Sequence, residues 1–276
     1  MAENCNHDCS TCGENCASRT AANKSFVEEA NSKTKVRKMI AVGSGQGGVG
    51  KSLTTALLAV AAGRAGKKAG ILDADITGPS IPHLFGIRDK AYGDGEFMFP
   101  VWSDKGCAVM STNLILDNTD DPVVWRGALI ASAVKQFWTD VAWGELDSLF
   151  IDMPPGTGDV PLTVFQSLPI DGIVIVTSPQ DLVSMVVGKA LKMAEKMSVP
   201  VLGIVENMSY ITCPDCGRKI RLFGEGHIRE TAEAHRIPHA AELPIRQDVA
   251  ALCDSGRVED LPDEFVLALS DMLASF

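Results

Sequence analysis

The sequence predicts an α/β fold whose mainly parallel sheet is covered by helices on both faces. Five apolar runs have the length of buried strands, at residues 39–42, 69–72, 149–152, 172–177 and 201–205. Stretches with helical patterning alternate with them, near residues 52–65, 127–141 and 182–197. Such alternation is typical of a parallel sheet, and 276 residues suffice for one sizeable domain with a full core.

The first strand runs into a glycine-rich turn with the sequence GSGQGGVGKSL. The turn fits G-x-x-x-x-G-K-[ST], with Gly45, Gly50, Lys51 and Ser52 at the fixed positions. Glycines let backbone N–H groups line a nest for phosphate oxygens, and the following helix adds unpaired N–H groups. Lys51 is expected to reach the β- and γ-phosphates and Ser52 to bind Mg²⁺. The turn predicts a nucleotide site made of Gly45, Gln46, Gly47, Gly48, Val49, Gly50, Lys51, Ser52 and Leu53.

The segment before this strand is polar and carries four closely spaced cysteines: Cys5, Cys9, Cys12 and Cys16. Four thiolates in so short a span can surround one metal centre, and the spacing is closer to iron–sulfur proteins than to zinc sites. The alternative is a reduced, disordered tail. We expect residues 1–36 to form a cysteine-rich tail and tether, and residues 37–276 to form the folded domain.

Two aspartates follow the second strand, in the sequence DADITGPSIP. Asp73 and Asp75 lie at the carboxyl end of a strand, where open α/β sheets place ligand chemistry. We predict that Asp75 serves the nucleotide site, whereas Asp73 fits a role in capping the next segment equally well. Residues 90–117 predict a hairpin or short strands added to the sheet, with Cys107 as a buried apolar residue.

The run at residues 149–152 ends in Asp152 and is followed by MPPGTGD. An apolar strand that ends in an acidic residue is a weak signal alone, but downstream of a phosphate loop it has the form of a Walker B strand. Asp152 is expected to hold Mg²⁺ directly or through water, and the next loop to order around the γ-phosphate. Ahead of this strand, Phe137 and Trp138 lie at helical spacing and predict core packing.

The run at residues 201–205 is followed by Glu206, Asn207 and Met208. A side-chain amide can pair with N6 and N7 of adenine, so Asn207 is a candidate base reader. On spacing alone, an asparagine that caps a turn is about as well supported. Residues 226–276 predict a helix, a short LPI segment and two closing helices, with Cys253 in a structural position.

Cys213 and Cys216 form a C-x₂-C knuckle, a shape shared by zinc ribbons and iron–sulfur sites. Two thiolates do not complete a tetrahedral site, and the sequence offers no second C-x₂-C nearby. The other ligands must come from the N-terminal cysteines or from another subunit, and a two-fold homodimer would bring two copies of one knuckle together. A redox switch made of the two cysteines is the second interpretation.

Composition narrows the classes of function. Acidic residues outnumber basic ones by 35 to 25, a formal net charge of −10, which argues against general binding to nucleic acid or to an anionic membrane. The N-terminus has no apolar signal core, and no segment approaches the length of a membrane span. We therefore expect a cytoplasmic protein, in which clustered cysteines are metal ligands before they are disulfides.

Six segments together resemble the Mrp/ApbC family of iron–sulfur cluster carrier P-loop ATPases: SGQGGVGKS, DADITGPSIP, IDMPPGTGDVPLTVFQ, TSPQDLVSM, GIVENMSY and CPDCG. They also resemble the wider class of dimeric MinD- and nitrogenase-reductase-like NTPases. The resemblance runs from about residue 39 to the C-terminal helices. It implies an ATP-binding homodimer that holds a labile [4Fe–4S] cluster and passes it to apo-proteins.

By motif, the resemblance assigns phosphate binding to residues 45–52, Mg²⁺ and water to Asp75 and Asp152, and the cluster to Cys213 and Cys216. One position departs from the family pattern G-K-G-G-V-G-K-S, a deviant Walker A form. The first lysine of that pattern contacts the nucleotide of the partner subunit, and Gln46 stands in its place. The departure predicts slow hydrolysis and weaker ATP-driven dimer closure, with nucleotide binding retained.

We therefore predict a cytoplasmic, homodimeric P-loop ATPase that exchanges iron–sulfur clusters with a donor and with apo-protein recipients. Its ligands are ATP, Mg²⁺ and a [4Fe–4S] cluster, and it has no nucleic-acid or membrane partner. A MinD/ParA-like positioning ATPase with a structural zinc knuckle is an alternative, but the sequence shows neither a basic amphipathic tail nor a basic stripe. An ATP-driven iron–sulfur reductase would have much the same sequence and would differ in having a redox partner.

Overall fold

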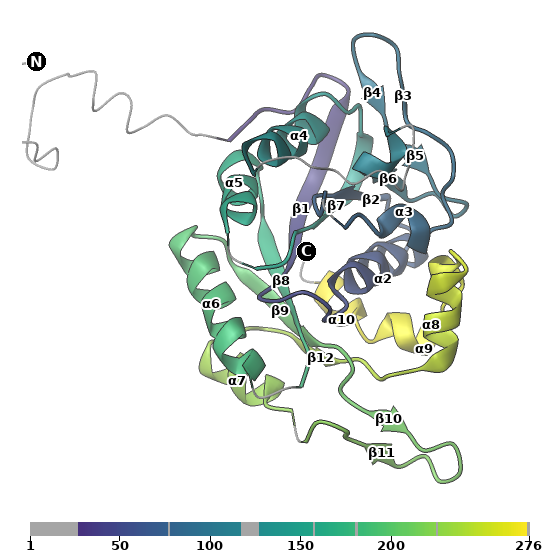
Figure 1. Cartoon of the computed structure of the whole chain (residues 1–276), viewed down its shortest axis with the longest axis vertical. Helices are drawn as coiled ribbons and strands as arrows, with labels where there is room; N and C mark the ends of the chain where they lie inside the picture. The colour runs from purple at the N-terminus through teal and green to yellow at the C-terminus, as the bar shows by residue number, and fades with distance from the viewer. Residues whose placement is uncertain are drawn as a thin grey trace, which may run out of the picture.

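The computed structural model describes residues 27–76, 78–116, 127–156, 158–179, 182–224 and 226–274. Within these residues, the centre of the molecule is an eight-stranded sheet in the order β12-β9-β8-β1-β7-β2-β6-β5 (Figure 1). Neighbouring strands are parallel except for β5, which pairs antiparallel with β6 at one edge. The strands are β1 (Thr34–Ser44), β2 (Ala69–Asp73), β5 (Val101–Trp102), β6 (Ala108–Met110), β7 (Gly144–Asp152), β8 (Gly172–Thr177), β9 (Val201–Glu206) and β12 (Ala240–Glu242).

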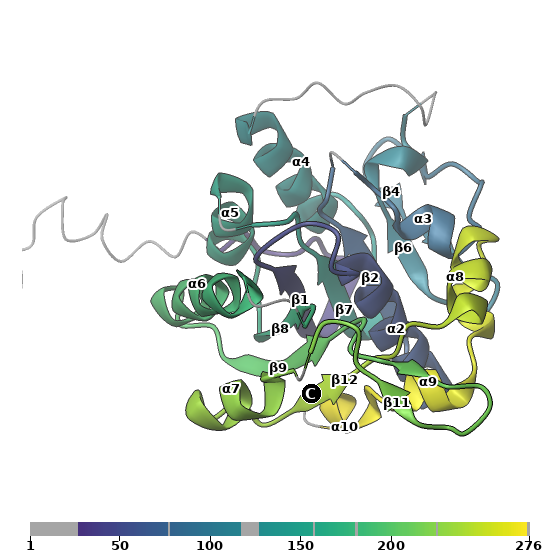
Figure 2. The ribbon, with the colours of Figure 1, turned by 60° about the horizontal axis from the view of Figure 1, so that its bottom comes forward.

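Helices cover both faces of the sheet because its central strands are apolar on both sides. In β1, Met39 and Ala41 belong to one core cluster while Ile40 and Val42 belong to the other, as the alternation of side chains along a strand requires. The helices are α2 (Lys51–Arg64), α3 (Ile81–Leu84), α4 (Gly127–Thr139), α5 (Asp159–Ser167), α6 (Leu182–Lys196), α7 (Ile228–Ala234), α8 (Gln247–Asp254), α9 (Asp263–Leu267) and α10 (Ser270–Leu273), with 3-10 turns at Thr112–Leu114 and Val258–Asp260. One cluster lies under α4, α5, α6 and α7, and the other under α2, α3, α8, α9 and α10 (Figure 2).

The predicted α/β fold with a mainly parallel sheet is confirmed. So are the short strands expected within residues 90–117, where β5 and β6 extend the sheet. Phe137, Trp138 and Cys107 are buried, as predicted, and Cys253, for which the sequence predicts a structural position, is buried as well.

Residues 27–36 belong to the folded domain, although the sequence predicts a tether there. β1 begins at Thr34, and its first half pairs with β7 while its side chains remain partly or largely exposed. Asn31 donates hydrogen bonds from Nδ2 to the carbonyls of Thr139 and Val141, at 2.9 and 2.8 Å. Backbone pairing and polar side chains fix this segment, so its composition carries no core signal.

The C-terminal part also differs from the prediction. The strand β12 precedes the LPI segment and pairs with β9, whereas no strand was predicted there. Three residues of mixed exposure are too few to show an alternating pattern. Three α-helices, rather than two, follow β12 within the described residues.

Two small hairpins lie outside the main sheet in the described part of the chain: β3 (Tyr92–Gly93) with β4 (Met98–Phe99), and β10 (Ile211–Thr212) with β11 (Lys219–Ile220). The β10–β11 hairpin extends away from the body of the molecule (Figure 1). No helix among the described residues is long and apolar enough to cross a membrane.

Candidate nucleotide site and cysteine hairpin

The glycine-rich turn joins the end of β1 to the first turn of α2. Gly48 and Gly50 have φ angles of 79° and 83°, in the left-handed region where a side chain causes strain. Gly47 and Gly48 are exposed, and a Cβ at Gly48 would meet no atom within 4 Å. The turn therefore presents open backbone beside the N-terminus of a 14-residue helix, which is an arrangement suited to phosphate.

Sheet topology brings the predicted acidic residues beside this turn. β7 lies between β1 and β2, so Asp152 is the register partner of Val42 on one side and of Asp73 on the other. Asp152 and Asp73 are fully buried, and the side chain of Asp75 is 15% exposed. Three carboxylates from two strand ends thus gather at the start of α2.

Lys51 supplies the positive charge among them and is itself buried. Its Nζ lies 2.9 Å from Asp152 Oδ1 and 3.6 Å from Asp75 Oδ2. Ser52 Oγ donates to Asp152 Oδ2 at 2.6 Å, and Thr55 Oγ1 donates to Asp152 Oδ1 at 2.9 Å. The motif does not include Thr55, although its position one helical turn after Lys51 could have indicated it.

Burial raises the pKa of the two innermost carboxyl groups. It raises the pKa of Asp152, against the opposing charge of Lys51 and the hydrogen bonds that this carboxylate accepts. It raises the pKa of Asp73 well above its ordinary value, and the negative charge of Asp152 adds to the effect. Asp73 accepts hydrogen bonds from Ser111 Oγ at 3.1 Å and from the N–H of Asp75 at 3.2 Å. Asp73 therefore shapes the backbone that carries Asp75.

These residues fit a Mg²⁺-nucleotide. The Ser52 hydroxyl and the Asp152 carboxylate are adjacent oxygen ligands of the kind that Mg²⁺ prefers. Lys51 offers a buried cation next to the open glycine backbone, where phosphate oxygens would lie. Asp75, at the edge of the cluster, could bind a water of the hydrated ion.

Gln46 lies half-buried in the turn, and its carbonyl accepts a hydrogen bond from Ser44 Oγ at 2.7 Å. The loop after β7 lies against the same segment. The N–H of Gly156 donates to the carbonyl of Ser44 at 3.0 Å, and the N–H of Met153 donates to that of Val42 at 3.0 Å. The predicted phosphate-sensing loop is thus in direct contact with the phosphate loop.

Asn207 lies at the end of β9, and its side chain reaches the phosphate loop. Its Nδ2 donates to the carbonyl of Val49 at 3.0 Å, and its backbone N–H donates to the carbonyl of Thr177 at 2.9 Å. A Cβ at Gly50 would lie 2.1 Å from Asn207 Nδ2. The side-chain amide therefore ties β9 to the loop, and its predicted reading of adenine stays a prediction.

The two cysteines of the knuckle lie apart from this site, in the turn of the β10–β11 hairpin. Cys213 is half-buried and Cys216 is exposed. The N–H of Cys213 donates to the carbonyl of Arg218, and the N–H of Gly217 donates to that of Cys213, both at 2.9 Å. Backbone N–H groups of Cys216 and Asp215 lower the pKa of the Cys213 thiol. The turn therefore favours the thiolate, which is the form that binds metals.

The two thiols of the hairpin do not by themselves make up a tetrahedral metal site. No group of three or more His, Cys, Asp or Glu side chains that could hold a metal occurs among the residues that the structure describes. The four N-terminal cysteines, Cys5, Cys9, Cys12 and Cys16, lie outside the described residues.

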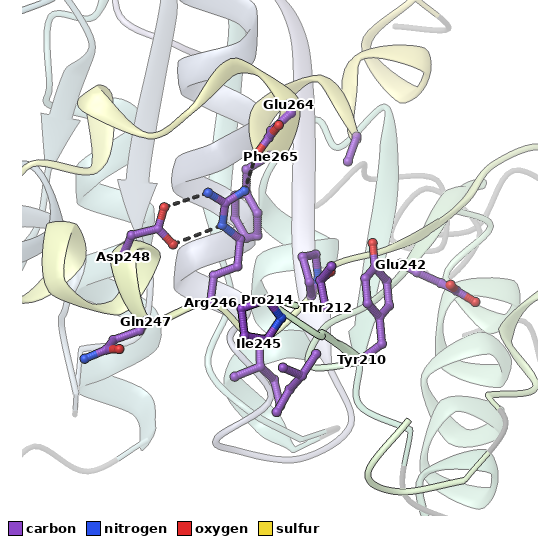
Figure 3. A pocket seen from close by; sticks show the side chains of 13 residues that line it. Tyr210, Thr212, Pro214, Glu242, Ile245, Arg246, Gln247, Asp248, Glu264 and Phe265 are labelled. Carbon is purple, nitrogen blue, oxygen red and sulfur yellow. Dashed lines mark hydrogen bonds and ion pairs between the residues drawn. The ribbon is translucent and has the colours of Figure 1, made fainter. Parts of the chain in front are cut away.

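A groove of about 850 Å³ separates the base of the hairpin from α8 and α9 (Figure 3). Tyr210, Thr212 and Pro214 line it from the hairpin side, and residues 244–248 with part of α9 line it from the other. Arg246 in this groove is paired with Asp248 and with Glu264, so its charge is already compensated there.

Comparison with known proteins identifies the family. The model of the ParA-group family described as NUBPL iron-transfer P-loop NTPases matches residues 35–273. The chain belongs to this family. An iron-sulfur cluster carrier protein of Clostridium perfringens is 46% identical over 233 residues, which cover 82% of each chain. A protein with the same description from Methanococcus maripaludis is 38% identical over 264 residues, 93% of this chain and 90% of the relative.

Solved structures agree with this family. A nucleotide-binding protein from Archaeoglobus fulgidus, determined in complex with ADP, is 50% identical with a TM-score of 0.75, and the match covers 83% of this chain and 91% of that one. MinD in the MinC–MinD cell division complex of Aquifex aeolicus gives a TM-score of 0.63 at 17% identity, over 87% of this chain and 96% of that one. The second likeness shows a shared fold alone.

Proposed function

We propose that this family member is an ATP-binding and ATP-hydrolysing carrier that binds a [4Fe–4S] cluster and transfers it to apo-proteins. The relatives described as iron-sulfur cluster carriers support the proposal across most of the chain. The ADP-bound relative at 50% identity supports a nucleotide at the glycine-rich turn.

The observation that carries the proposal is the incomplete thiolate site on an exposed hairpin. Cys213 and Cys216 supply two ligands, whereas a [4Fe–4S] cluster takes four thiolates. A two-fold homodimer would set two such pairs face to face and complete the site. Ile220, Leu222 and Phe223, just after the cysteines, are 45%, 55% and 45% exposed, and exposed apolar side chains of this kind favour contact with another protein surface.

An exposed cluster site suits a carrier, because the cargo must leave as well as bind. The nucleotide site would set the dimer state through the β- and γ-phosphates, held by Lys51 and by the Mg²⁺ ligands Ser52 and Asp152. Nucleotide binding alone can shift such an equilibrium if one state binds the nucleotide more tightly. Slow hydrolysis, expected from Gln46, is compatible with this role.

The test is to purify the full chain without oxygen and to measure iron, sulfide and zinc per subunit together with the oligomeric state. We expect iron and sulfide in a dimer, and their loss in the double variant Cys213→Ser, Cys216→Ser with Mg²⁺-ATP binding retained. Cys253→Ala, at a buried position of α8, is the matched control and should keep the cluster. Stoichiometric zinc without sulfide would contradict the carrier and favour a structural knuckle.

A further inference from the structure

The first limb of the cysteine hairpin, residues 209–212, is the outgoing limb, and backbone hydrogen bonds join it to the segment that follows β12. The N–H of Ser209 donates to the carbonyl of Leu243 at 2.9 Å, and the N–H of Ile245 donates to the carbonyl of Tyr210 at 2.8 Å. These bonds hold the root of the hairpin but do not reach Cys213, which lies beyond the two-residue strand β10.

An ion pair joins the returning limb, which runs from Lys219 to Gly224, to the end of β12. Arg221, the residue after β11, places Nη2 3.2 and 3.0 Å from the two carboxylate oxygens of Glu242. The two side chains are 22% and 15% exposed, so water screens this pair less than it screens a surface pair. Glu242 ends β12 and is the register partner of Glu206, which ends β9.

Glu206 is the point where both limbs meet the sheet. Its Oε1 accepts a hydrogen bond from Ser209 Oγ of the outgoing limb at 2.8 Å. Its carboxylate also lies against Gly226, beyond the returning limb, where a Cβ would come within 2.3 Å of Oε1. Burial raises the pKa of Glu206. The charge of Glu242 also raises this pKa, whereas the charge of Arg221 lowers it. Two carboxylates, at the ends of β9 and β12, therefore bind side chains from the two limbs of the hairpin: Glu206 binds Ser209, and Glu242 binds Arg221.

Asn207, the residue that follows β9, connects the base of the hairpin to the phosphate loop. Asn207 donates a hydrogen bond to the carbonyl of Val49. It lies so close to Gly50 that no side chain would fit at position 50. Val49 and Gly50 directly precede Lys51, so a change in the backbone of the loop must be accommodated at Asn207. Two residues, Asn207 and Glu206, therefore span the distance between the loop and the base of the hairpin.

The hairpin also has space in which to move. The groove of about 850 Å³ lies between Tyr210, Thr212 and Pro214 on one wall and residues 244–248 with α9 on the other (Figure 3). A second hollow, of about 570 Å³, is lined by Cys213, Cys216 and the returning limb up to Gly224. A small rotation at the base of the hairpin would produce a larger displacement of the cysteines, because they lie at the far end of the hairpin.

We propose that the Arg221–Glu242 ion pair transmits the conformational effect of nucleotide binding to the two cysteines. The effect reaches this ion pair from the phosphate loop through Val49 and Asn207. The inference rests on the proposed function, since it takes the glycine-rich turn as the nucleotide site and the cysteines as cluster ligands. Arg221 acts through the geometry of the hairpin and contacts neither ligand.

The experiment measures the alkylation of Cys213 and Cys216 by iodoacetamide in the cluster-free full chain, peptide by peptide, with and without Mg²⁺-ADP or Mg²⁺-ATP. In the wild-type protein we expect nucleotide to change the rate at these cysteines by at least about fivefold, the lower end of typical coupling between two sites. In Arg221→Met and in Glu242→Gln the ratio of the two rates should fall to one, while nucleotide affinity is unchanged.

Arg218→Met is the matched control, because it removes the same charge from an exposed position of the same hairpin. It should keep the wild-type ratio, and Arg221→Lys should restore part of it. The buried Cys107 and Cys253 should stay unreactive in every variant, which reports an intact fold. A merely structural role for Arg221 would raise the cysteine rates equally with and without nucleotide and leave the ratio unchanged.

The proposal is overturned if nucleotide has no effect on these rates in the wild-type protein, or if Arg221→Met keeps the wild-type ratio. The outcome is separate from the test of the carrier, because alkylation is followed without a cluster. A protein that carries zinc and no sulfide could still show the coupling. A genuine carrier could lack it.

Discussion

The nucleotide site and the cysteine hairpin contrast in burial and in completeness. Around Lys51, the charges are buried and paired within one chain, on strand ends that the sheet holds in register. Around Cys216, the chain is exposed, the strands are two residues long, and the hairpin offers two thiols where the proposed cluster takes four. A site made by one chain can be rigid. A site that must open to release cargo can be shared between chains and held by few contacts.

The largest effect, a loss of ATP hydrolysis, should come from removing the positive charge of Lys51 in the nucleotide site. Lys51→Met keeps the length and apolar stem of the side chain but leaves Asp152 without its 2.9 Å partner. We expect kcat for ATP hydrolysis to fall by about 10²–10³, as when one preorganised charge-stabilising group is lost. Iron and sulfide content of the protein purified without nucleotide should stay at the wild-type level, because Lys51 is paired with Asp75 and Asp152, away from the cysteines. Loss of the cluster in this variant would show that the two regions are not separable.

The contrast also explains what the sequence could predict. The glycine turn, Asp152 and the cysteine pair were all visible because each depends on consecutive residues with a definite backbone geometry or chemistry. The contacts that join the two regions were not visible. Asn207 is 158 residues from Val49, and Arg221 binds a carboxylate at the end of β12, a strand too short to show a pattern.

The polar start of the domain was missed for a related reason. Residues 34–38 pair with β7 through the backbone while their side chains remain partly or largely exposed, so their sequence looks like a linker. The sequence supports two roles for Asp73 equally, and its contacts with Ser111 and with the N–H of Asp75 favour the local structural one. Side-chain partners of this kind follow from strand order, which spacing does not reveal.

A second, smaller effect concerns Gln46, which brings a hydrogen-bonding amide and no charge to the turn. A lysine that reaches across a dimer would act like an arginine finger, worth about 10³–10⁵ in rate where supplied in full. For Gln46→Lys we expect kcat to rise about tenfold or more with little change in Mg²⁺-ATP affinity, since Lys51 and the glycine backbone remain.

Turnover should be compared in cluster-free and cluster-loaded protein, with Gln46→Met as the matched neutral control. If the added lysine acts across a dimer, as the proposed function implies, the rise should depend on protein concentration. Equal kcat for wild-type and Gln46→Lys in both states would mean that this position does not limit hydrolysis.

The smallest expected effect is on the free energy of unfolding. It tests whether burying the Asp73 carboxyl in the nucleotide site destabilises the folded protein. Asp73 is fully buried, and both burial and the charge of Asp152 raise its pKa. In the unfolded chain this carboxyl ionises in its ordinary range, whereas in the folded protein it stays protonated to higher pH. Folding is therefore most favoured below the ordinary pKa and loses stability as pH rises towards the raised value.

Asp73→Asn removes this loss, because an amide does not ionise and its oxygen can still accept from the N–H of Asp75. We expect the free energy of unfolding by urea to match wild-type near pH 4 and to exceed it at pH 8. Asp94→Asn is a control of opposite sign: backbone N–H groups of Phe97 and Glu96 lower the pKa of Asp94, so this variant should lose stability above the ordinary range. If the difference between Asp73→Asn and wild-type were the same at every pH, the carboxyl would titrate in its ordinary range in the folded protein, and the charge of Lys51 would offset the effect of burial.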